Sequence, residues 1–227
     1  MTKGLWVVWN YKNKDADYGD FDELYLSVFW LKPKYRPTTK QIKDYVKLCK
    51  DKGYKVYLCV NCYADENKNR TFEEIIIDID YFAPLADGLS LDYIRYNNMR
   101  LANYKNDTPI MNVLEYAKTK CNDIKMAVFP IHNSWLYGQR YNRMQKFGVI
   151  QPMLYPYSMF GSNYKLNKTL TNLLIRLTKI LYPKSEPCLQ AWADKKSKRT
   201  MKDLNDDISA CGNDGYSIFR YKTYLKL

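Results

Sequence analysis

The stretch Ala86-Asp87-Gly88-Leu89-Ser90-Leu91-Asp92-Tyr93-Ile94-Arg95-Tyr96 decides the fold expected for this chain. Its apolar centre is typical of a short strand, along which side chains alternate between two faces. Gly88, Ser90 and Asp92 therefore share one face, which suits the crowded inside of a barrel or a sheet crevice. Leu89 and Leu91 share the other, which would pack on a helix. An acid at the carboxyl end of such a strand lies where α/β folds place their chemistry.

Seven further apolar runs alternate with helical patterns, an order typical of parallel strands joined by crossover helices. Besides 88–92, the predicted strands cover residues 5–10, 24–30, 55–61, 125–130, 149–154, 188–192 and 216–220. Capping-box pairs, Thr38 with Gln41 and Thr71 with Glu74, predict helix starts. Leucines at 170, 173, 174, 177 and 181 form a helical stripe that we expect to pack on the sheet.

Eight such units in 227 residues favour a single TIM (β/α)8 barrel, one α/β domain over residues 1–227. An open doubly wound sheet is the alternative. Residues 11–23, between the first two strands, are polar and too short for a full helix. We therefore expect an abbreviated first crossover. No Pro/Gly-rich linker marks a domain boundary.

The net charge of +12 indicates either a solvating lysine-rich surface or attraction to a polyanion such as nucleic acid, anionic lipid or an acidic polymer. The lysines are scattered and no nucleic-acid motif is present, so we expect no nucleic-acid partner. No apolar run is long enough to span a membrane. The N-terminal residues lack the apolar core of a signal peptide, which leaves a cytoplasmic or a released, lysin-like protein as alternatives. We expect a monomer.

The chain contains six cysteines and one histidine, His132. Cys59 and Cys62 have the spacing of half a zinc site, but no second pair follows. The sequence therefore predicts neither a metal nor a cofactor. The cysteines are expected to be small buried residues of a chain that needs no disulfides. No local signature supports a Cys/His nucleophilic pair.

Two strand ends bear an acid in the inward register, Asp92 and Asp194, and these are the candidate catalytic residues. Paired carboxylates perform acid/base or nucleophilic work at a glycosidic bond, while aromatic rings and amides bind sugars. Candidate substrate-binding residues at or near the strand ends are Asn10, Arg95, Tyr96, His132, Gln151, Tyr155, Gln190 and Trp192. Structural readings stay open: Asp92 could pair with Arg95, Asp194 could be solvated in its basic loop, and Trp192 could fill the barrel.

Four segments in order resemble a glycosidase-like family of TIM-barrel proteins in bacteria and archaea. They are DGLSLDYIRY at 87–96, QPMLYP at 151–156, PCLQAW at 187–192 and NDGYSIF at 213–219. The resemblance implies a barrel in which Asp92 is the leading catalytic acid and Arg95, Tyr155, Gln190 and Trp192 line the substrate cleft. The family's proline after the DYIRY tyrosine is Asn97 here, and its serine-histidine after PMxYP is replaced by Tyr157-Ser158.

The same strand also looks like the chitinase signature DGxDxDxE, with two replacements. Ser90 stands for an aspartate and Ile94 for the acid glutamate, so a mechanism that uses that glutamate is excluded. The expected function is hydrolysis of a polysaccharide, with an acidic cell-wall glycan as one candidate. The alternative is a glycan-binding barrel without catalysis.

Overall fold

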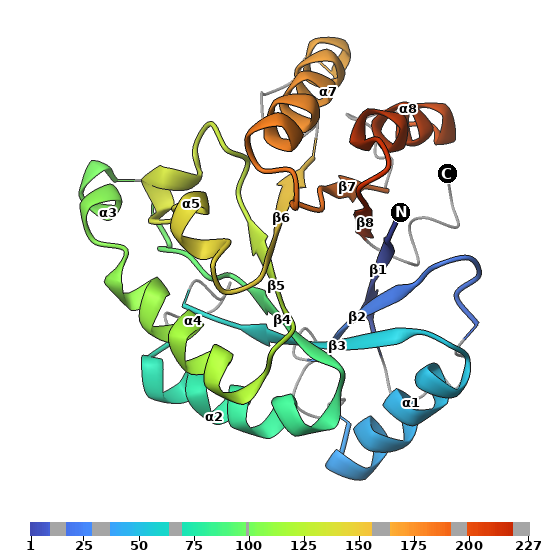
Figure 1. Ribbon diagram of the computed structural model, residues 1–227, viewed down its shortest axis with the longest axis vertical. Coiled ribbons are helices and arrows are strands. Elements are labelled where there is room, and N and C mark those ends of the chain that lie inside the picture. The colour runs from blue at the N-terminus through green and yellow to red at the C-terminus, as the bar shows by residue number, and fades with distance from the viewer. Residues whose placement is uncertain are drawn as a thin grey trace.

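The computed structural model describes residues 1–9, 17–28, 37–63, 70–98, 100–155, 164–191 and 199–219. Eight parallel strands, each paired with its neighbours in chain order, close into one barrel because β8 pairs with β1. The strands are β1 Lys3–Val8, β2 Glu23–Ser27, β3 Lys55–Asn61, β4 Gly88–Asp92, β5 Ile124–Val128, β6 Val149–Leu154, β7 Cys188–Gln190 and β8 Tyr216–Phe219. The predicted (β/α)8 barrel is confirmed (Figure 1).

Helices surround the strands wherever the crossovers are long enough (Figure 1). Within the described ranges they are α1 Thr39–Asp51, α2 Phe72–Phe82, α3 Leu101–Lys105, α4 Thr108–Lys120, α5 Tyr141–Met144, α7 Tyr164–Leu181 and α8 Met201–Cys211, with 3₁₀ turns Ala83–Leu85 and Ser134–Tyr137. Both predicted capping boxes are formed, so Thr38 and Thr71 each accept a hydrogen bond from the backbone three residues on. No helix in the described part of the chain is long and apolar enough to cross a bilayer.

An aromatic cluster covers β1 and β2, where residues 17–22 form no helix. The ring of Trp9 stacks on Tyr45 of α1, with ring centroids 4.3 Å apart and planes 12° from parallel. The Tyr18 hydroxyl hydrogen-bonds to that of Tyr45, and the Tyr18 amide donates to the Tyr54 hydroxyl at 2.9 Å. These rings bury apolar area that a crossover helix would otherwise cover, which makes the expected short first crossover workable.

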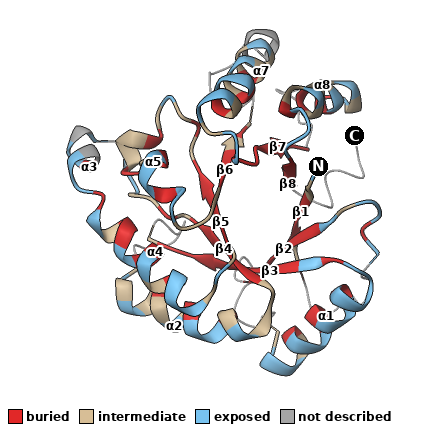
Figure 2. Ribbon diagram, viewed as in Figure 1, coloured by how far each residue is buried: buried red, intermediate tan, exposed pale blue. Residues whose placement is uncertain are grey.

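Inside the barrel, glycines face tyrosines of neighbouring strands. A Cβ atom at Gly88 would lie 2.5 Å from the ring of Tyr57 and 2.7 Å from the Asp123 carbonyl oxygen. A Cβ at Gly4 would lie equally close to the ring of Tyr25. Both tyrosines are fully buried, and the strands are buried along most of their length (Figure 2). The small residues predicted on the inward face of β4 thus leave the room that the Tyr57 side chain of β3 fills.

A charged cluster is buried at the amino ends of the strands. Lys125 Nζ donates to both carboxylate oxygens of Glu186 at 2.8 Å and lies 3.0 Å from Glu23. The Tyr25 hydroxyl donates to Glu23 at 2.5 Å, and Gln151 Nε2 donates to Glu186 at 3.3 Å. Burial raises the pKa of Glu186, and the Lys125 charge opposes that shift. Among the described residues, Lys125 is therefore the cation that pairs with both carboxylates inside the barrel.

The predicted packing of the leucine stripe on α7 is confirmed for Leu174, which is half-buried against the core, and wrong for three other leucines. Thr171, Ile175 and Thr178 face the barrel and are fully buried, whereas Leu173, Leu177 and Leu181 are exposed. Helical periodicity identifies an apolar face but not the direction in which it points. Here α8 packs beside α7, and Lys168 of α7 reaches Asp203 and Asp206 of α8 at 2.6 and 2.9 Å. These ion pairs are part of a packing that leaves Leu173, Leu177 and Leu181 exposed.

Replacing Lys125 by methionine should destabilise the protein by about 3–5 kcal/mol at pH 7, because two buried carboxylates lose their cation. A carboxyl whose pKa is raised by folding binds its proton more tightly in the folded state, so stability falls as the pH rises through that pKa. The loss should therefore be smaller at about pH 5. Urea unfolding at both pH values measures it, with exposed Lys43→Met as the control. Equal losses at the two pH values would contradict this account.

Candidate active site

A cavity of about 410 Å³ opens at the carboxyl ends of the strands. Six of its described lining residues are aromatic and two are charged. The lining comprises Trp6, Asp92, Tyr93, Arg95, Ala127, Phe129, Pro130, Asn133, Tyr137, Met153, Tyr155 and Phe219. This is the end of a TIM barrel at which active sites are found. The cavity is therefore the candidate site.

Asp92 ends β4 in the inward register predicted for it and is 7% exposed. Its Oδ1 accepts a hydrogen bond from the Tyr93 amide at 2.8 Å. Its backbone carbonyl accepts from the Cys62 amide at 2.8 Å, which extends the β3–β4 pairing to the rim. The carboxylate is thus held by the strand ends themselves, which fixes its direction better than a long loop would.

Tyr93 follows Asp92 with a left-handed backbone, at φ 52°. Among the described residues other than glycine it is the one with a positive φ, a conformation that costs an L-residue about 1–2 kcal/mol. The turn sends the chain away from the strand and places the Tyr93 ring in the cavity wall. Strain of this kind is concentrated at functional sites, where the surrounding structure holds it in place.

The Arg95 guanidinium lies among three aromatic rings. Its carbon is 4.5 Å from the centroid of Phe129, 5.2 Å from that of Tyr93 and 5.7 Å from that of Tyr137. Nη1 donates to the Tyr96 carbonyl at 3.3 Å, while the buried Nε has no acceptor. Burial lowers the pKa of Arg95, and the Asp92 charge opposes that shift. The rings orient the cation and leave donors for a ligand.

Tyr155, Phe219 and Trp6 form an aromatic wall of the cavity. The ring of Tyr155 stacks on Phe219 at 5.9 Å, and Phe219 meets Trp6 at 6.0 Å. The Tyr155 hydroxyl lies 3.4 Å from Cys188 Sγ. Burial raises the pKa of the Cys188 thiol to about 11 and raises the pKa of the Tyr155 hydroxyl well above its ordinary value. Both stay protonated at neutral pH, so Cys188 is no thiolate nucleophile here.

The structure brings some of the predicted site residues together and separates others. Asp92, Arg95 and Tyr155 line the cavity. Gln151 and Gln190 face the barrel interior and are fully buried, and neither lines the cavity. Gln151 instead contacts Glu186 in the amino-end cluster.

Two further candidates lie beside the cavity, and three fall where no placement is described. Tyr96 lines a neighbouring pocket of about 310 Å³, where its hydroxyl donates to the Asn106 carbonyl at 2.7 Å. His132 is exposed and does not line the main cavity. Asn10, Trp192 and Asp194 lie outside the described residues.

Sequence reasoning missed several cavity residues, chiefly Trp6, Phe129, Asn133, Tyr137 and Phe219. Alternation along β1 and β8 could have identified Trp6 and Phe219, because each shares a face with small inward residues of its strand. Tyr137 lies in a 3₁₀ turn after β5, which no periodicity marks. The predicted set of site residues therefore lacked most of the aromatic side chains that line the cavity.

All six cysteines lie in the described part of the chain as free thiols, and five are buried. Within that part, no group of three or more His, Cys, Asp or Glu side chains is arranged to hold a metal ion. Cys59 and Cys62 point to different environments, since Cys59 packs inside the barrel and Cys62 in the outer core. The half zinc spacing in the sequence is therefore not a shared ligand pair.

Replacing Tyr93 by glycine should give a protein more stable than Tyr93→Ala by about 1 kcal/mol, since both lose the ring and glycine relieves the left-handed strain. At an ordinary backbone position alanine is the more stable of the two. Chemical denaturation of the two variants measures the difference. A more stable alanine variant would show that the turn after Asp92 is not strained.

Solved structures that share the fold include glycoside hydrolases. A chitinase from Bacteroides thetaiotaomicron has a TM-score of 0.60 and 12% identity over 98% of this chain and 90% of its own. The catalytic domain of a mannanase from Streptomyces sp. SirexAA-E has a TM-score of 0.57 and 9% identity, over 97% of this chain and 75% of its own. A D-psicose 3-epimerase from Clostridium cellulolyticum H10 has a TM-score of 0.56 and 11% identity, over 96% of this chain and 84% of its own. At these identities the likeness shows the fold alone. No protein-family model matches the sequence, and no curated protein is similar to it.

Proposed function

We propose that the protein hydrolyses glycosidic bonds of a polysaccharide, with Asp92 as a catalytic carboxylate. The observation that carries this proposal is the placement of Asp92 in an aromatic-lined cavity at the carboxyl face of the barrel. Ring faces such as those of Trp6, Tyr155 and Phe219 can pack on the apolar faces of sugar rings. The barrel shared with a chitinase and a mannanase supports the same class by analogy.

Hydrolysis needs a second carboxyl group, and Asp194 is the candidate. The Ala191 amide donates to the carbonyl of the cavity residue Phe219 at 2.9 Å, so Ala191, three residues before Asp194, lies beside the cavity. At its other end, Arg199 Nε donates to the Gln190 carbonyl at 2.5 Å. The described residues on either side of Asp194, Ala191 and Arg199, therefore both lie at the carboxyl end of β7, which supports a role for Asp194 at this rim.

In the proposed reaction one carboxylic acid gives its proton to the glycosidic oxygen as the bond to the anomeric carbon breaks. The other carboxylate attacks that carbon or takes a proton from the attacking water. Ile94, at the position of the glutamate in the chitinase-like signature, is fully buried in the outer core. The acid must accordingly come from another strand, as proposed for Asp194.

The substrate we propose carries anionic groups, as an acidic cell-wall glycan does. Arg95 supports this specificity, because its positively charged guanidinium lines the cavity among aromatic rings. A carboxylate matches the charge and the planar geometry of the guanidinium. A sugar whose carboxylate binds the Arg95 guanidinium would also contact the aromatic rings that surround it.

A glycan-binding barrel without catalysis is the second candidate. It is favoured by the cavity's charge, because Asp92 is the one carboxylate among the described lining residues. Calorimetric titration with oligosaccharides, run beside a reducing-end assay, separates the two functions. Binding without any product over days would support the binding protein.

Asp92→Asn should lower turnover by about 10²–10⁴-fold, because the amide can neither attack nor transfer a proton, while folding is kept. Reducing-end release from a panel of neutral and uronic-acid polysaccharides measures it. Asp87→Asn, at the other end of β4, is the matched control: it loses an ion pair to Lys50 far from the cavity and should retain activity. Full activity of the Asp92 variant would end the proposal.

Arg95→Gln should reduce kcat/KM on uronic-acid polymers by about 10- to 100-fold, the loss expected for charged hydrogen bonds. Activity on neutral polymers should change much less. Arg100→Gln, an arginine outside the cavity lining, serves as the control. An equal loss on neutral and acidic polymers would show that Arg95 does not select for charge.

A further inference from the structure

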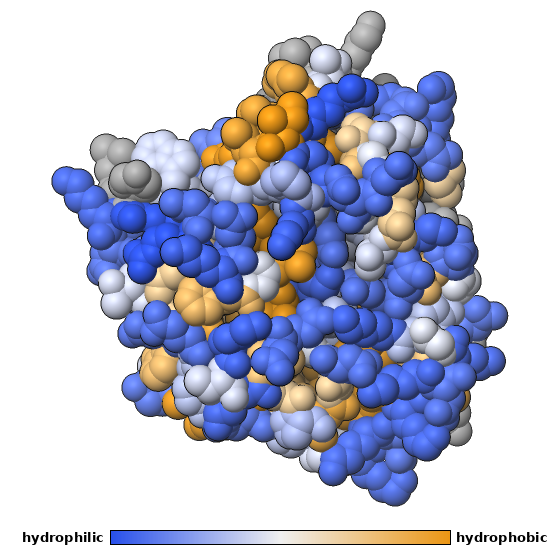
Figure 3. Space-filling model, in the orientation of Figure 1, coloured by the Kyte–Doolittle hydropathy of each residue, from blue (hydrophilic) through white to orange (hydrophobic). Residues whose placement is uncertain are grey.

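Helix α7 turns an apolar stripe to solvent. Leu173, Leu177, Ile180 and Leu181 are 60%, 40%, 75% and 53% exposed, at spacings that place them on one helical face. In Figure 3 apolar residues gather over the top of the molecule, where Figure 1 places α7. Scattered exposed leucines are ordinary, but a contiguous apolar patch marks a surface that binds something.

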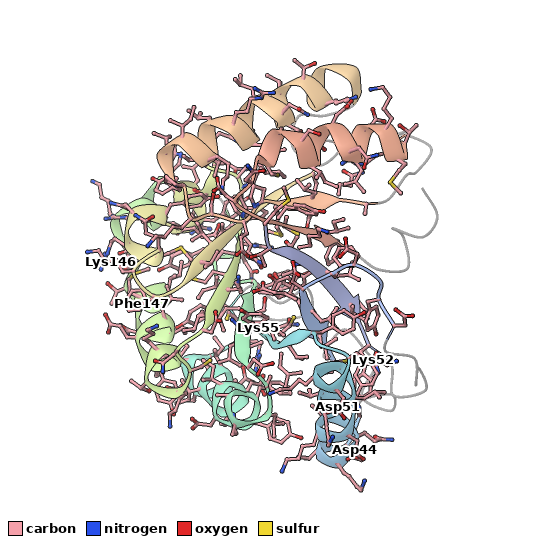
Figure 4. All side chains as sticks on the ribbon, turned by 45° about the vertical axis from the view of Figure 1, so that its right-hand side comes forward. Asp44, Asp51, Lys52, Lys55, Lys146 and Phe147 are labelled. Atoms are coloured by element: carbon pink, nitrogen blue, oxygen red, sulfur yellow. The ribbon has the colours of Figure 1, made fainter. Side chains whose placement is uncertain are left out.

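A basic groove begins where this stripe ends. Residues 183–185 lie just beyond the end of α7 and line a groove of about 550 Å³ at the amino ends of β5 and β6. Lys118, Lys146 and Lys184 line the same groove. Its one described carboxylate, Asp123, is bound to Lys55 and accepts from the Tyr57 hydroxyl at 2.9 Å. Lys146 and Phe147 lie at the edge of the molecule (Figure 4). The groove therefore presents net positive charge.

The flank of the stripe is also basic. Helix α7 contains no acidic residue, and two of its four basic residues, Lys168 and Lys179, are paired with acids of α8 and with Asp214. Arg176, on the exposed face between Leu173 and Leu177, and Lys184, just beyond the helix, are both exposed. A ligand that binds this surface must accordingly carry apolar groups that contact the stripe and negative charges that contact the basic residues beside it.

We propose that α7 and the adjoining basic groove bind the surface of an anionic phospholipid membrane. The leucines would enter the boundary between headgroups and acyl chains, while Lys146, Arg176 and Lys184 contact phosphates. A second copy of the chain fits less well, because pairing two α7 faces would bring the unpaired cations of both copies together. The net charge of +12 attracts the whole protein to the same surface.

This orientation leaves the cavity accessible. The groove lies at the amino ends of the strands and the cavity at their carboxyl ends. A barrel bound through its amino end and α7 therefore presents the mouth of the cavity to the aqueous phase. The inference does not rest on the proposed hydrolysis and holds equally for a glycan-binding barrel.

Co-sedimentation with vesicles tests the proposal on the full chain. We expect binding to vesicles of phosphatidylglycerol and phosphatidylcholine that exceeds binding to pure phosphatidylcholine by tenfold or more, and that falls as salt rises. Leu177→Glu with Ile180→Glu, and separately Lys146→Glu with Lys184→Glu, should each weaken binding about tenfold or more. Ile77→Glu, at an exposed isoleucine of α2, and Lys43→Glu with Lys52→Glu, on α1 and at its C-cap, are the matched controls.

Circular dichroism of each variant checks that folding is kept, and the salt dependence of the unmodified chain gives a result that needs no variant. The proposal is overturned by equal binding to both vesicle types, by no binding to either, or by controls that weaken binding as much as the α7 pair. Light scattering that finds a dimer, made monomeric by Leu177→Glu with Ile180→Glu, would instead identify the stripe as an interface between copies.

Discussion

Closure of eight strands into one ring forces every second side chain into a narrow interior, and the volumes inside must match. The contact of Gly88 with the ring of Tyr57 shows how this chain meets that condition, since even one added carbon would overlap the ring. The same alternation that keeps Gly88 and Ser90 small delivers Asp92 to the rim. The alternation of side chains along β4 thus determines both the packing inside the barrel and the position of the candidate acid.

The two ends of the barrel use polar groups in opposite ways. At the amino end Lys125 forms ion pairs with both Glu23 and Glu186, so all three charges are paired inside the barrel. At the carboxyl end Arg95 is surrounded by rings rather than by carboxylates, and its Nε stays without an acceptor. The charges of the first cluster are paired within the protein, whereas the Arg95 guanidinium lines the cavity and can pair with a ligand. Chemistry is therefore expected at the second end.

Much of the barrel could be predicted from the sequence, and the limits have physical causes. The predicted bounds of β3, β4 and β6 agree with the structure, because apolar runs with clear ends define them. Alternation also placed Gln151 and Gln190 on the inward face, but it carries no information about depth along the barrel axis. Gln151 is inward and still belongs to the amino-end cluster, since the stagger between strands decides its layer. The roles assigned to the site residues stay predictions.

The tether formed by Arg199 has a consequence for how such a barrel can change. Its guanidinium joins the carbonyl of Gln190 to Asp207 of α8, at 2.5 and 2.6 Å, and so fastens the two sides of residues 192–198 to each other. Insertions or deletions between these anchor points would leave strand pairing untouched. Descendants of this sequence could therefore acquire new ligand preferences by altering that one segment, without re-evolving the scaffold beneath it.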